Sequence, residues 1–318
     1  MERMRGIVIA VRPRRVLVRA QGREYSCPVL KRMTRGERTA RAPLAVGDRV
    51  SIEISSGGSS TLMEVEPRRT QISRLAGIPP REQVIAANVD RVLALQAVDQ
   101  PPFDAAALDR LLVIAEAGGV LAAIGLNKTD LATAGSAENR SGPGHAEQLL
   151  ISYRQSRYPV FLLSARLARG IEALEESLSG HETVILGPSG VGKSTLLNRL
   201  IPGLSQRTQA VRRVSGHGVH TTTRVDYLDL PGGGAVLDTP GIGITVPAGV
   251  KPRDLARLYP EFSIHLGACR FADCLHSGEP GCTLEEAARA GEVSCERWER
   301  YRELLRSLIG QTTGIGRN

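Results

Sequence analysis

The sequence predicts a multidomain protein with an N-terminal all-β barrel of the OB type, a central α/β unit and a small α-helical unit at the C-terminal end. Three observations predict this organisation. Residues 5–67 hold five short segments rich in Val and Ile, and residues 84–245 alternate apolar strands with amphipathic helices. Four of the five cysteines then fall within 27 residues. A chain of 318 residues that is 42% hydrophobic and 23% charged can bury the cores of two or three domains, which excludes a disordered or fibrous protein.

The first domain is expected over residues 1–70. Five short strands in about 60 residues suit a small closed barrel, and an SH3-like barrel is the alternative that has the same spacing. The segment 71–83, which contains Pro79 and Pro80, is predicted to be a linker. The expected strands are 5–11, 15–20, 23–29, 48–54 and 61–66.

The excess positive charge lies entirely in this first domain. Residues 1–70 contain 15 Lys and Arg against 7 Asp and Glu, whereas the remaining 248 residues contain 26 of each sign. A basic module is suited to a polyanion, because Lys and Arg neutralise phosphates and release counterions. The few aromatic residues favour contact with phosphates or folded RNA over the capture of single strands. An ordinary solvated basic surface is the alternative interpretation.

A glycine-rich segment follows an apolar strand and opens a helix, which is the context of a phosphate-binding loop. It reads GPSGVGKS and fits the pattern GxxxxGK[ST]. Glycines allow backbone N–H groups to converge on phosphates at the N-terminus of a helix. We expect Lys193 to neutralise the β and γ phosphates and the Ser194 hydroxyl to bind Mg²⁺. The predicted nucleotide-binding residues here are Gly187, Pro188, Ser189, Gly190, Val191, Gly192, Lys193, Ser194 and Thr195.

A second motif, DTPG at 238–241, ends another apolar strand. Its Asp238 can hold Mg²⁺ through water, and the Gly241 N–H can meet the γ-phosphate. A polar loop, SGHGVHTTT at 215–223, lies between the two motifs. One of its threonines, Thr221 or Thr222, is expected to complete the Mg²⁺ shell, with Thr222 as the assigned ligand.

Two further motifs select the base. NKTD at 127–130 follows the predicted strand 120–126, and the Asp130 carboxylate can accept both the N1–H and the 2-amino hydrogens of guanine, which adenine does not offer. Ser164 and Ala165 end another strand, and the Ala165 N–H is expected to point at guanine O6. Together with the phosphate loop, these motifs predict GTP as the ligand. The base-binding residues are Asn127, Lys128, Thr129, Asp130, Ser164 and Ala165.

The order of the motifs is unusual. In ordinary small GTPases the phosphate loop comes first and NKxD follows, whereas here NKxD at 127 precedes the phosphate loop at 187. A circularly permuted chain can build the same sheet, because domain termini often lie close together. We therefore predict a circularly permuted GTPase domain over residues 84–245.

The C-terminal unit is expected over residues 246–318, with a charged helix from about 284 to 309. Its cysteines have the spacing C-x₄-C-x-H-x₅-C, and three thiolates with one imidazole can close a tetrahedral Zn²⁺ site. In a chain without an export signal, such clustering favours a metal over disulfides. Cys295 and His265 are alternative fourth ligands outside the compact spacing. The predicted ligands are Cys269, Cys274, His276 and Cys282.

The basic barrel, NKTD, LLSA, GPSGVGKS, HTTT, DTPG and the cysteine motif occur in the order found in one family. The sequence resembles the RsgA (YjeQ/YloQ) family of circularly permuted bacterial GTPases, which act in maturation of the small ribosomal subunit. The resemblance covers residues from about 5 to 310. It implies an OB domain, a permuted GTPase domain and a zinc domain with one structural Zn²⁺, held by the four ligands named above. It also implies GTP hydrolysis stimulated by the small subunit. The chain departs from the family at His217 and Val219, where arginines are more frequent.

The group that orients the attacking water does not follow from the motifs. Many GTPases carry a Gln directly after DxxG, but Ile242 occupies that place and cannot bond to water. His220, just before the threonines, is the candidate within the chain, since family precedent points to the same loop. An ordinary exposed loop histidine is the alternative, and the partner itself is another source of the missing group.

The predicted function is therefore GTP hydrolysis in late maturation of the small (30S) ribosomal subunit. Its partners would be that subunit with its rRNA, and GTP or GDP with Mg²⁺. The alternatives are a GTP-controlled RNA-binding switch whose hydrolysis is incidental, and a structural zinc and RNA-binding protein with a degenerate NTPase. No run of about 18 apolar residues predicts a membrane span, and Met1–Arg5 lacks the character of an export signal. A cytoplasmic monomer is expected.

Overall fold

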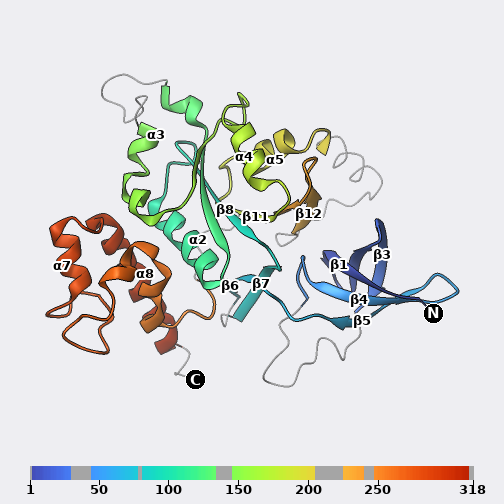
Figure 1. Cartoon of the computed structure of the whole chain (residues 1–318), viewed down its shortest axis with the longest axis horizontal. Helices are drawn as coiled ribbons and strands as arrows, with labels where there is room; N and C mark the ends of the chain where they lie inside the picture. Colours follow the sequence, from blue (N-terminus) through green and yellow to red (C-terminus); the bar gives the residue numbers. More distant parts are fainter. Residues whose placement is uncertain are drawn as a thin grey trace.

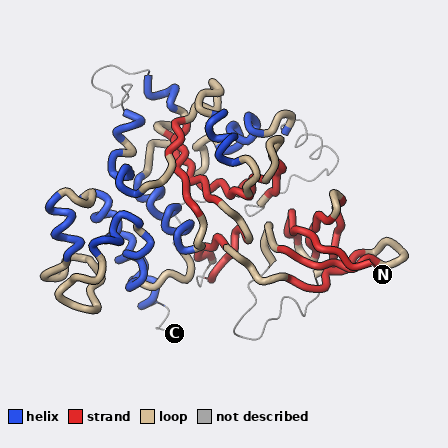
Figure 2. The backbone as a smooth tube through the Cα atoms, viewed as in Figure 1, coloured by secondary structure: helices blue, strands red, loops and turns tan. Residues whose placement is uncertain are grey.

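The computed structural model describes residues 2–29, 44–77, 81–133, 145–204, 225–239 and 247–314. The all-β N-terminal unit lies at one end of the molecule and the helical C-terminal unit at the other, with the α/β unit between them (Figure 1, Figure 2). This arrangement follows the order of the three units along the chain. None of the helices in these described ranges combines the length and the apolar character that crossing a membrane requires.

The N-terminal unit is a curled antiparallel sheet. Its strand order is β3-β2-β1-β4-β5, and Ser60 at the start of β5 donates a hydrogen bond to the Ser26 carbonyl of β3, which brings the two edge strands together. Alternate residues such as Val8, Val18 and Ile52 are fully buried inside the curl. The predicted OB-type barrel is thus confirmed. Its strands are β1 (Glu2–Arg12), β2 (Arg15–Ala20), β3 (Arg23–Pro28), β4 (Arg49–Ile54) and β5 (Ser60–Val65).

The segment predicted as a linker is instead part of a folded hairpin. Strands β6 (Gln71–Ala76) and β7 (Arg81–Ala87) pair antiparallel, because the prolines that suggested a linker fall between two strands rather than within one. The hairpin touches all three units. Ile72 is buried in the core of the central unit, Val46 of the barrel bridges to Ala86, and Arg74 bridges to Pro247 at the start of the C-terminal unit.

The central unit is built on a six-stranded sheet with the order β10-β9-β8-β11-β13-β12. Every neighbouring pair is parallel except β12 and β13, as the predicted α/β alternation requires for most of the sheet. The strands are β8 (Arg91–Ala97), β9 (Leu121–Asn127), β10 (Val160–Leu162), β11 (Glu182–Leu186), β12 (Asp226–Asp229) and β13 (Ala235–Asp238).

Helices cover both faces of this sheet. On one face, Val92 of β8 packs with Leu108 and Leu112 of α2 (Ala105–Ala117), next to α3 (His145–Gln148) and the 3₁₀ turn η2 (Ile151–Ser156). On the other face, Leu93 packs with side chains of α4 (Ile171–Leu178) and α5 (Lys193–Leu200). The 3₁₀ turn η1 (Thr129–Thr133) follows β9. The adjacent residues 92 and 93 thus anchor opposite layers, as side-chain alternation along a strand dictates.

The C-terminal unit consists of two 3₁₀ turns and two helices, η3 (Pro252–Leu258), η4 (Pro260–His265), α7 (Thr283–Ala290) and α8 (Cys295–Gly314). The sequence predicts one helix over 284–309, but the chain breaks at Gly291. Its φ of 77° places it in the left-handed region, and its N–H donates to the carbonyls of Ala287 and Ala288 to end α7. The Arg297 N–H then donates to Ser294 Oγ in the first turn of α8.

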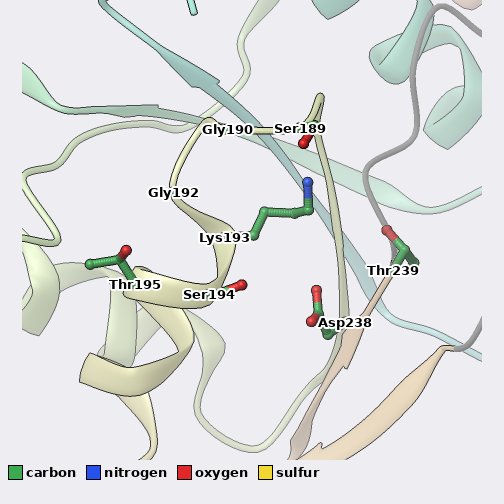
Figure 3. Close-up of a pocket in the computed structure, with 8 residues that line it drawn as sticks. All are labelled: Ser189, Gly190, Gly192, Lys193, Ser194, Thr195, Asp238 and Thr239. Atoms are coloured by element: carbon green, nitrogen blue, oxygen red, sulfur yellow. The ribbon is translucent and has the colours of Figure 1, made fainter. Parts of the chain in front are cut away.

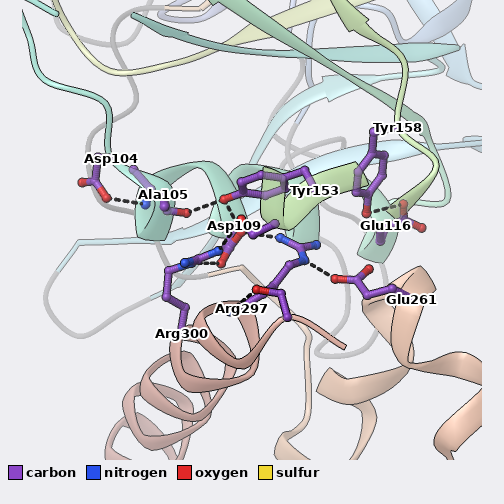
Figure 4. Close-up of polar contacts among 12 residues, drawn as sticks. Asp104, Ala105, Asp109, Glu116, Tyr153, Tyr158, Glu261, Arg297 and Arg300 are labelled. Atoms are coloured by element: carbon purple, nitrogen blue, oxygen red, sulfur yellow. Dashed lines mark hydrogen bonds and ion pairs between the residues drawn. The ribbon is translucent and has the colours of Figure 1, made fainter. Parts of the chain in front are cut away.

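A buried ion network joins the central unit to α8 (Figure 4). The Asp109 carboxylate on α2 forms ion pairs with Arg297 and Arg300 of α8. The Tyr153 hydroxyl also donates a hydrogen bond to Asp109 Oδ1, at 2.6 Å. Arg297 also pairs with Glu261 of η4, and its guanidinium lies 4.6 Å from the centre of the Tyr153 ring. Burial alone would lower the pKa of Arg297, but Asp109 and Glu261 raise it above its ordinary value. The buried arginine is therefore always charged, and the two carboxylates compensate its charge.

The barrel is held to the central unit by a separate ion pair. Arg19 Nη1 of β2 lies 2.5 and 2.6 Å from the two carboxylate oxygens of Asp229 on β12. The guanidinium carbon of Arg19 is also 5.7 Å from the centre of the Tyr227 ring on the same strand. These contacts place the barrel against the outer strand of the central sheet (Figure 1).

The buried ion network is predicted to contribute strongly to the free energy of unfolding. Asp109→Ala should lower the free energy of unfolding by ~3–5 kcal/mol, because it leaves the buried Arg297 without its main counter-charge. Urea unfolding measures this change. Glu303→Ala, which removes an exposed carboxylate from the same helix as Arg297, is the control and should change stability by less than about 0.5 kcal/mol. Equal effects of the two substitutions would contradict the assigned role of the network.

Candidate functional site

The predicted nucleotide motifs meet at one edge of the central sheet. β9 ends in Asn127, the phosphate loop follows β11, and β13 ends in Asp238. Because β8, β9, β10, β11 and β13 are parallel, their carboxyl ends lie at the same edge, which is where ligands bind in open α/β sheets. Motifs separated by up to 111 residues in the sequence are thereby brought into one site.

The phosphate loop wraps around its own lysine. Lys193 Nζ donates to the carbonyls of Gly187 and Pro188 at 2.7 and 2.9 Å. Burial lowers the pKa of Lys193, and the neighbouring Asp238 opposes that shift. Gly192 has a φ of 95°, and a Cβ there would collide with Asn127 Nδ2. Only glycine fits this position, because the base-binding motif packs directly against the phosphate loop.

A cavity of about 380 Å³ lies over the loop. Figure 3 shows the Lys193 and Asp238 side chains directed into the same space, with the Ser194 hydroxyl beside them. An ammonium, a carboxylate and a hydroxyl around a loop of backbone N–H groups form an arrangement suited to a phosphate chain with a divalent cation. The cavity is lined by Ser189, Gly190, Gly192, Lys193, Ser194, Thr195, Asp238 and Thr239.

The Asp238 carboxylate has the environment of a cation ligand. Burial raises the pKa of its carboxyl to about 6, although Lys193 lowers it. Within the described ranges, the buried Oδ1 atom of Asp238 has no hydrogen-bond partner. The hydroxyl of the next residue, Thr239, already has a partner, since it donates to the Ile185 carbonyl at 2.8 Å. A hydrated cation would give the orphaned oxygen a partner, so the residues present fit Mg²⁺.

Asn127 connects the base-binding loops to the phosphate loop. Its Nδ2 donates to the Val191 carbonyl at 2.9 Å, and its Oδ1 accepts from the Ala165 N–H at 3.0 Å. The side chain is 1% exposed. The Ala165 N–H, predicted to face guanine O6, is thus directed at Asn127 in this structure, and a base would have to share that donor.

The remaining base-binding residues also lie together. Ser164 Oγ donates to Asp130 Oδ1 at 2.6 Å, which orients the carboxylate predicted to read guanine. Thr129 is fixed to the next loop, because both its N–H and its hydroxyl donate to the Leu163 carbonyl, at 3.1 and 2.9 Å. Lys128 has a φ of 62°, and its ammonium donates to the Gln100 carbonyl.

Several predicted residues lie outside the described ranges: Gly241 after Asp238, Ile242, and the loop residues His217, Val219, His220, Thr221 and Thr222. Sequence reasoning missed two described residues at the site, Gln100 and Arg199. Both take part through bonds that involve backbone carbonyls, so the sequence carries no motif that would reveal them.

The four predicted metal ligands form one cluster in the C-terminal unit. The ligand atoms of Cys269, Cys274, His276 and Cys282 all lie within 4.8 Å of one another. The three sulfurs are 3.4, 3.8 and 3.6 Å from Nδ1 of His276. This cluster can hold a metal ion. The two alternatives are not part of it: Cys295 is exposed at the start of α8, and the His265 Nδ1 lies 3.9 Å from Glu292.

Neighbouring side chains hold the ligands in place. The Glu279 carboxylate accepts from the N–H groups of Leu275 and Ser277, at 2.9 and 2.7 Å, and so fixes the turn that carries His276. Trp298 Nε1 of α8 donates to the His276 carbonyl at 2.9 Å. These hydrogen bonds stabilise the left-handed backbone of His276, which has a φ of 61°. Metal ligands are commonly oriented by such bonds from neighbouring residues.

A family model described as RsgA GTPase matches residues 65–245. Among curated proteins, the chain is 38% identical over 295 residues to the small ribosomal subunit biogenesis GTPase RsgA of Gemmatimonas aurantiaca, covering 92% of this chain and 93% of that protein. It is 37% identical over 303 residues to the protein of the same name from Azotobacter vinelandii, covering 95% of this chain and 85% of that protein.

Two solved structures are similar over almost the whole length. YjeQ from Thermotoga maritima has a TM-score of 0.75 and 30% sequence identity, covering 97% of this chain and 99% of that one. YloQ, a circularly permuted GTPase, has a TM-score of 0.70 and 25% identity, covering 98% and 96%. The permuted order of the motifs and the three-unit architecture are thus shared with known proteins.

The ionised Asp238 carboxylate should lower the stability of the nucleotide-free protein. Its carboxyl has a pKa of about 6 in the folded protein against an ordinary 3.8, so its ionised form disfavours folding at neutral pH. Asp238→Asn should therefore raise the free energy of unfolding of the nucleotide-free protein by up to ~3 kcal/mol at pH 7.5. The gain should shrink between pH 6 and 4, where the wild-type carboxyl takes up its proton. Urea unfolding at pH 7.5 and 5 measures this trend, and a loss of stability at pH 7.5 would refute it.

Proposed function

This chain belongs to the RsgA GTPase family, and on that premise we propose that it hydrolyses GTP as a factor in late biogenesis of the small ribosomal subunit. The observation that carries the proposal is the convergence of the permuted motifs, with Asp130, Lys193 and Asp238 all at one sheet edge. GTP hydrolysis is the activity of the family. The ribosomal role comes from the relatives' names, which describe GTPases of small-subunit biogenesis.

In this proposal the nucleotide spans the site from Asp130 to Asp238. The base lies against 127–130 and 164–165, with Asp130 accepting the N1–H and 2-amino hydrogens of guanine. The phosphates lie over 187–195, beside Lys193. Ser194 and Asp238 would hold Mg²⁺, an assignment supported by the orphaned Oδ1 of Asp238, and the ion would neutralise charge on the phosphates. Sequence pattern alone supports Thr222 as a further Mg²⁺ ligand, Gly241 as a γ-phosphate contact and His220 as the residue that orients water.

The cysteine cluster is assigned to one structural Zn²⁺. For bonds of about 2.3 Å to sulfur and about 2.0 Å to nitrogen, a tetrahedral ion separates its S and N ligands by about 3.5 Å. The S···N separations of 3.4 to 3.8 Å in the cluster match this value. Four protein ligands leave no open coordination position, which supports a structural rather than a catalytic ion. Zn²⁺ would cross-link the turn at His276 to the start of α7.

The basic barrel is the proposed contact with the rRNA of the small subunit. All of the net charge of +8 is in residues 1–70, and exposed arginines such as Arg12 and Arg23 lie at its hairpins. These side chains can contact phosphates without disturbing Arg19, which is bound to Asp229. A ribosome-assembly factor of this kind works in the cytoplasm, and we assign the chain to that compartment as a monomer that docks on the subunit.

The ribosomal role predicts stimulated turnover. The free protein should hydrolyse GTP at an unassisted rate, on the order of 10⁻⁴ to 10⁻² s⁻¹. Purified 30S subunits should bind the GTP form and accelerate hydrolysis, whereas 50S subunits should do neither. A phosphate-release assay combined with pelleting measures both effects. If 30S subunits neither bind nor stimulate at low salt, the chain is a GTP-controlled RNA switch with incidental hydrolysis instead.

The barrel contact predicts a dependence on salt. Replacing Arg12 and Arg23 by Glu should weaken binding to the subunit and lower the slope of log affinity against log salt by roughly one for each phosphate that is no longer neutralised. Turnover without subunits should be unchanged, because neither residue lines the nucleotide cavity. Equal salt slopes for the wild type and the double variant would exclude the barrel from the interface.

Zinc content tests the metal assignment. Freshly purified, reduced protein should contain one zinc per chain, which strong chelators remove. Structural zinc contributes ~10–16 kcal/mol in small metal-dependent folds, so Cys274→Ser should lose the metal and expose the C-terminal unit to protease. Cys295→Ser is the matched control and should retain the metal, since Cys295 is exposed outside the cluster. Elemental analysis that finds no zinc in the wild type would overturn the assignment.

A further inference from the structure

Arg199, in the last turn of α5, binds the loop that carries Ser164 and Ala165. Its Nε donates to the Ala165 carbonyl at 2.9 Å, and its Nη2 donates to the Arg166 carbonyl at 2.8 Å. The two bonds use neighbouring N–H groups of one planar guanidinium on two successive carbonyls. Only arginine offers such a rigid pair of donors, so this contact fixes the orientation of two peptide groups at once.

The loop itself is a closed unit. Its ends are joined by reciprocal backbone bonds, from Ser164 N–H to the Arg169 carbonyl at 3.0 Å and from Arg169 N–H to the Ser164 carbonyl at 3.1 Å. Ala168 reverses the chain with a φ of 57°. A loop closed in this way moves as one body, so an attachment at Ala165 and Arg166 sets the position of Ser164 as well.

A chain of hydrogen bonds leads from Arg199 to the carboxylate that reads the base. The Arg166 carbonyl, which accepts from Arg199, belongs to the same peptide group as the Leu167 N–H. That N–H donates to Ser164 Oγ at 3.1 Å, and Ser164 Oγ donates to Asp130 Oδ1 at 2.6 Å. Consecutive bonds of this kind polarise one another, and the charge on the guanidinium strengthens the first of them.

From this geometry we infer that Arg199 is a positioning residue for guanine selectivity. It fixes Ala165, whose N–H donates to Asn127 Oδ1 in this structure and is the proposed donor to guanine O6, and it orients Asp130 through Leu167 and Ser164. Since α5 begins at Lys193, the same side chain also links the base-binding loop to the helix of the phosphate loop. The inference rests on the proposed guanine site, and not on the ribosomal role.

The test compares nucleotides that lack different recognised groups of guanine. Competition against a fluorescent GDP analogue gives dissociation constants for GDP, for IDP, which lacks the 2-amino group, and for 2,6-diaminopurine riboside diphosphate, which keeps the 2-amino group but lacks O6 and the N1–H. In Arg199→Met, affinity for GDP should fall roughly five- to tenfold. The preference of the variant for GDP over each analogue should fall by a similar factor, because both groups that contact the base lose their orientation.

Two variants make the test specific. Arg166→Ala is the matched control: it removes an exposed guanidinium from the same loop but keeps the Arg166 carbonyl that Arg199 binds, so both preferences should equal those of the wild type. Arg199→Lys keeps the charge but cannot bond both carbonyls, and it should lose selectivity as Arg199→Met does. A thermal unfolding curve accompanies each variant to show that it is folded.

The outcomes separate the two proposals. If the wild type selects guanine and Arg199→Met weakens all three nucleotides by the same factor, Arg199 is only structural and the inference fails while the guanine site stands. If Arg199→Lys restores the wild-type preferences, the paired donors are not the cause and the inference also fails. If the wild type itself binds the three diphosphates and ADP equally, the guanine site fails and the inference fails with it.

Discussion

The buried amide of Asn127 is the constraint around which the nucleotide site is built. An unsatisfied amide in the interior costs about 1–3 kcal/mol for each group left without a partner, so Asn127 requires both the Val191 carbonyl and the Ala165 N–H within reach. That requirement fixes the distance between the base-binding loop and the phosphate loop. It also explains Gly192, since any Cβ there would collide with the amide. Arg199 ties the base-binding loop to α5, the helix that the phosphate loop opens, through its own pair of bonds, so that loop is held at two points.

The sequence predicts those parts of the molecule that depend on local pattern. The strands of the barrel follow from short segments rich in Val and Ile, and those of the sheet from apolar runs between amphipathic helices. The phosphate loop follows from its glycines, and the metal cluster from four ligands within 14 residues. The hairpin of β6 and β7 resembles a linker in the sequence, because its prolines are a stronger local signal than the strands on either side. The break at Gly291 escapes prediction because a single glycine inside a charged helical pattern is a weak signal.

Pairings between distant charges cannot be predicted in the same way. Arg297 and Asp109 are 188 residues apart, and Arg19 and Asp229 are 210 apart. In the sequence each of these residues resembles an ordinary surface charge. No local sequence pattern distinguishes an arginine that will be buried from the many that stay exposed to water. Arg199 is hidden for a related reason, because its partners are backbone carbonyls, which every residue possesses. The arrangement of the three units thus rests on pairings that only the folded chain reveals.

The hairpin of β6 and β7 has a consequence for how the molecule can be divided or deformed. One of its strands bridges to the barrel at Val46 and the other to Pro247, which begins the C-terminal unit, while Ile72 is embedded in the central core. A fragment that ends at any boundary between units would therefore lose one of the contacts that the hairpin makes with the neighbouring unit. A tilt of the barrel would likewise act on Pro247 through the ladder of six residue pairs that joins β6 and β7. The two end units, which are remote along the chain, are therefore connected through this hairpin, which gives a load applied to one of them a route to the other outside the nucleotide site.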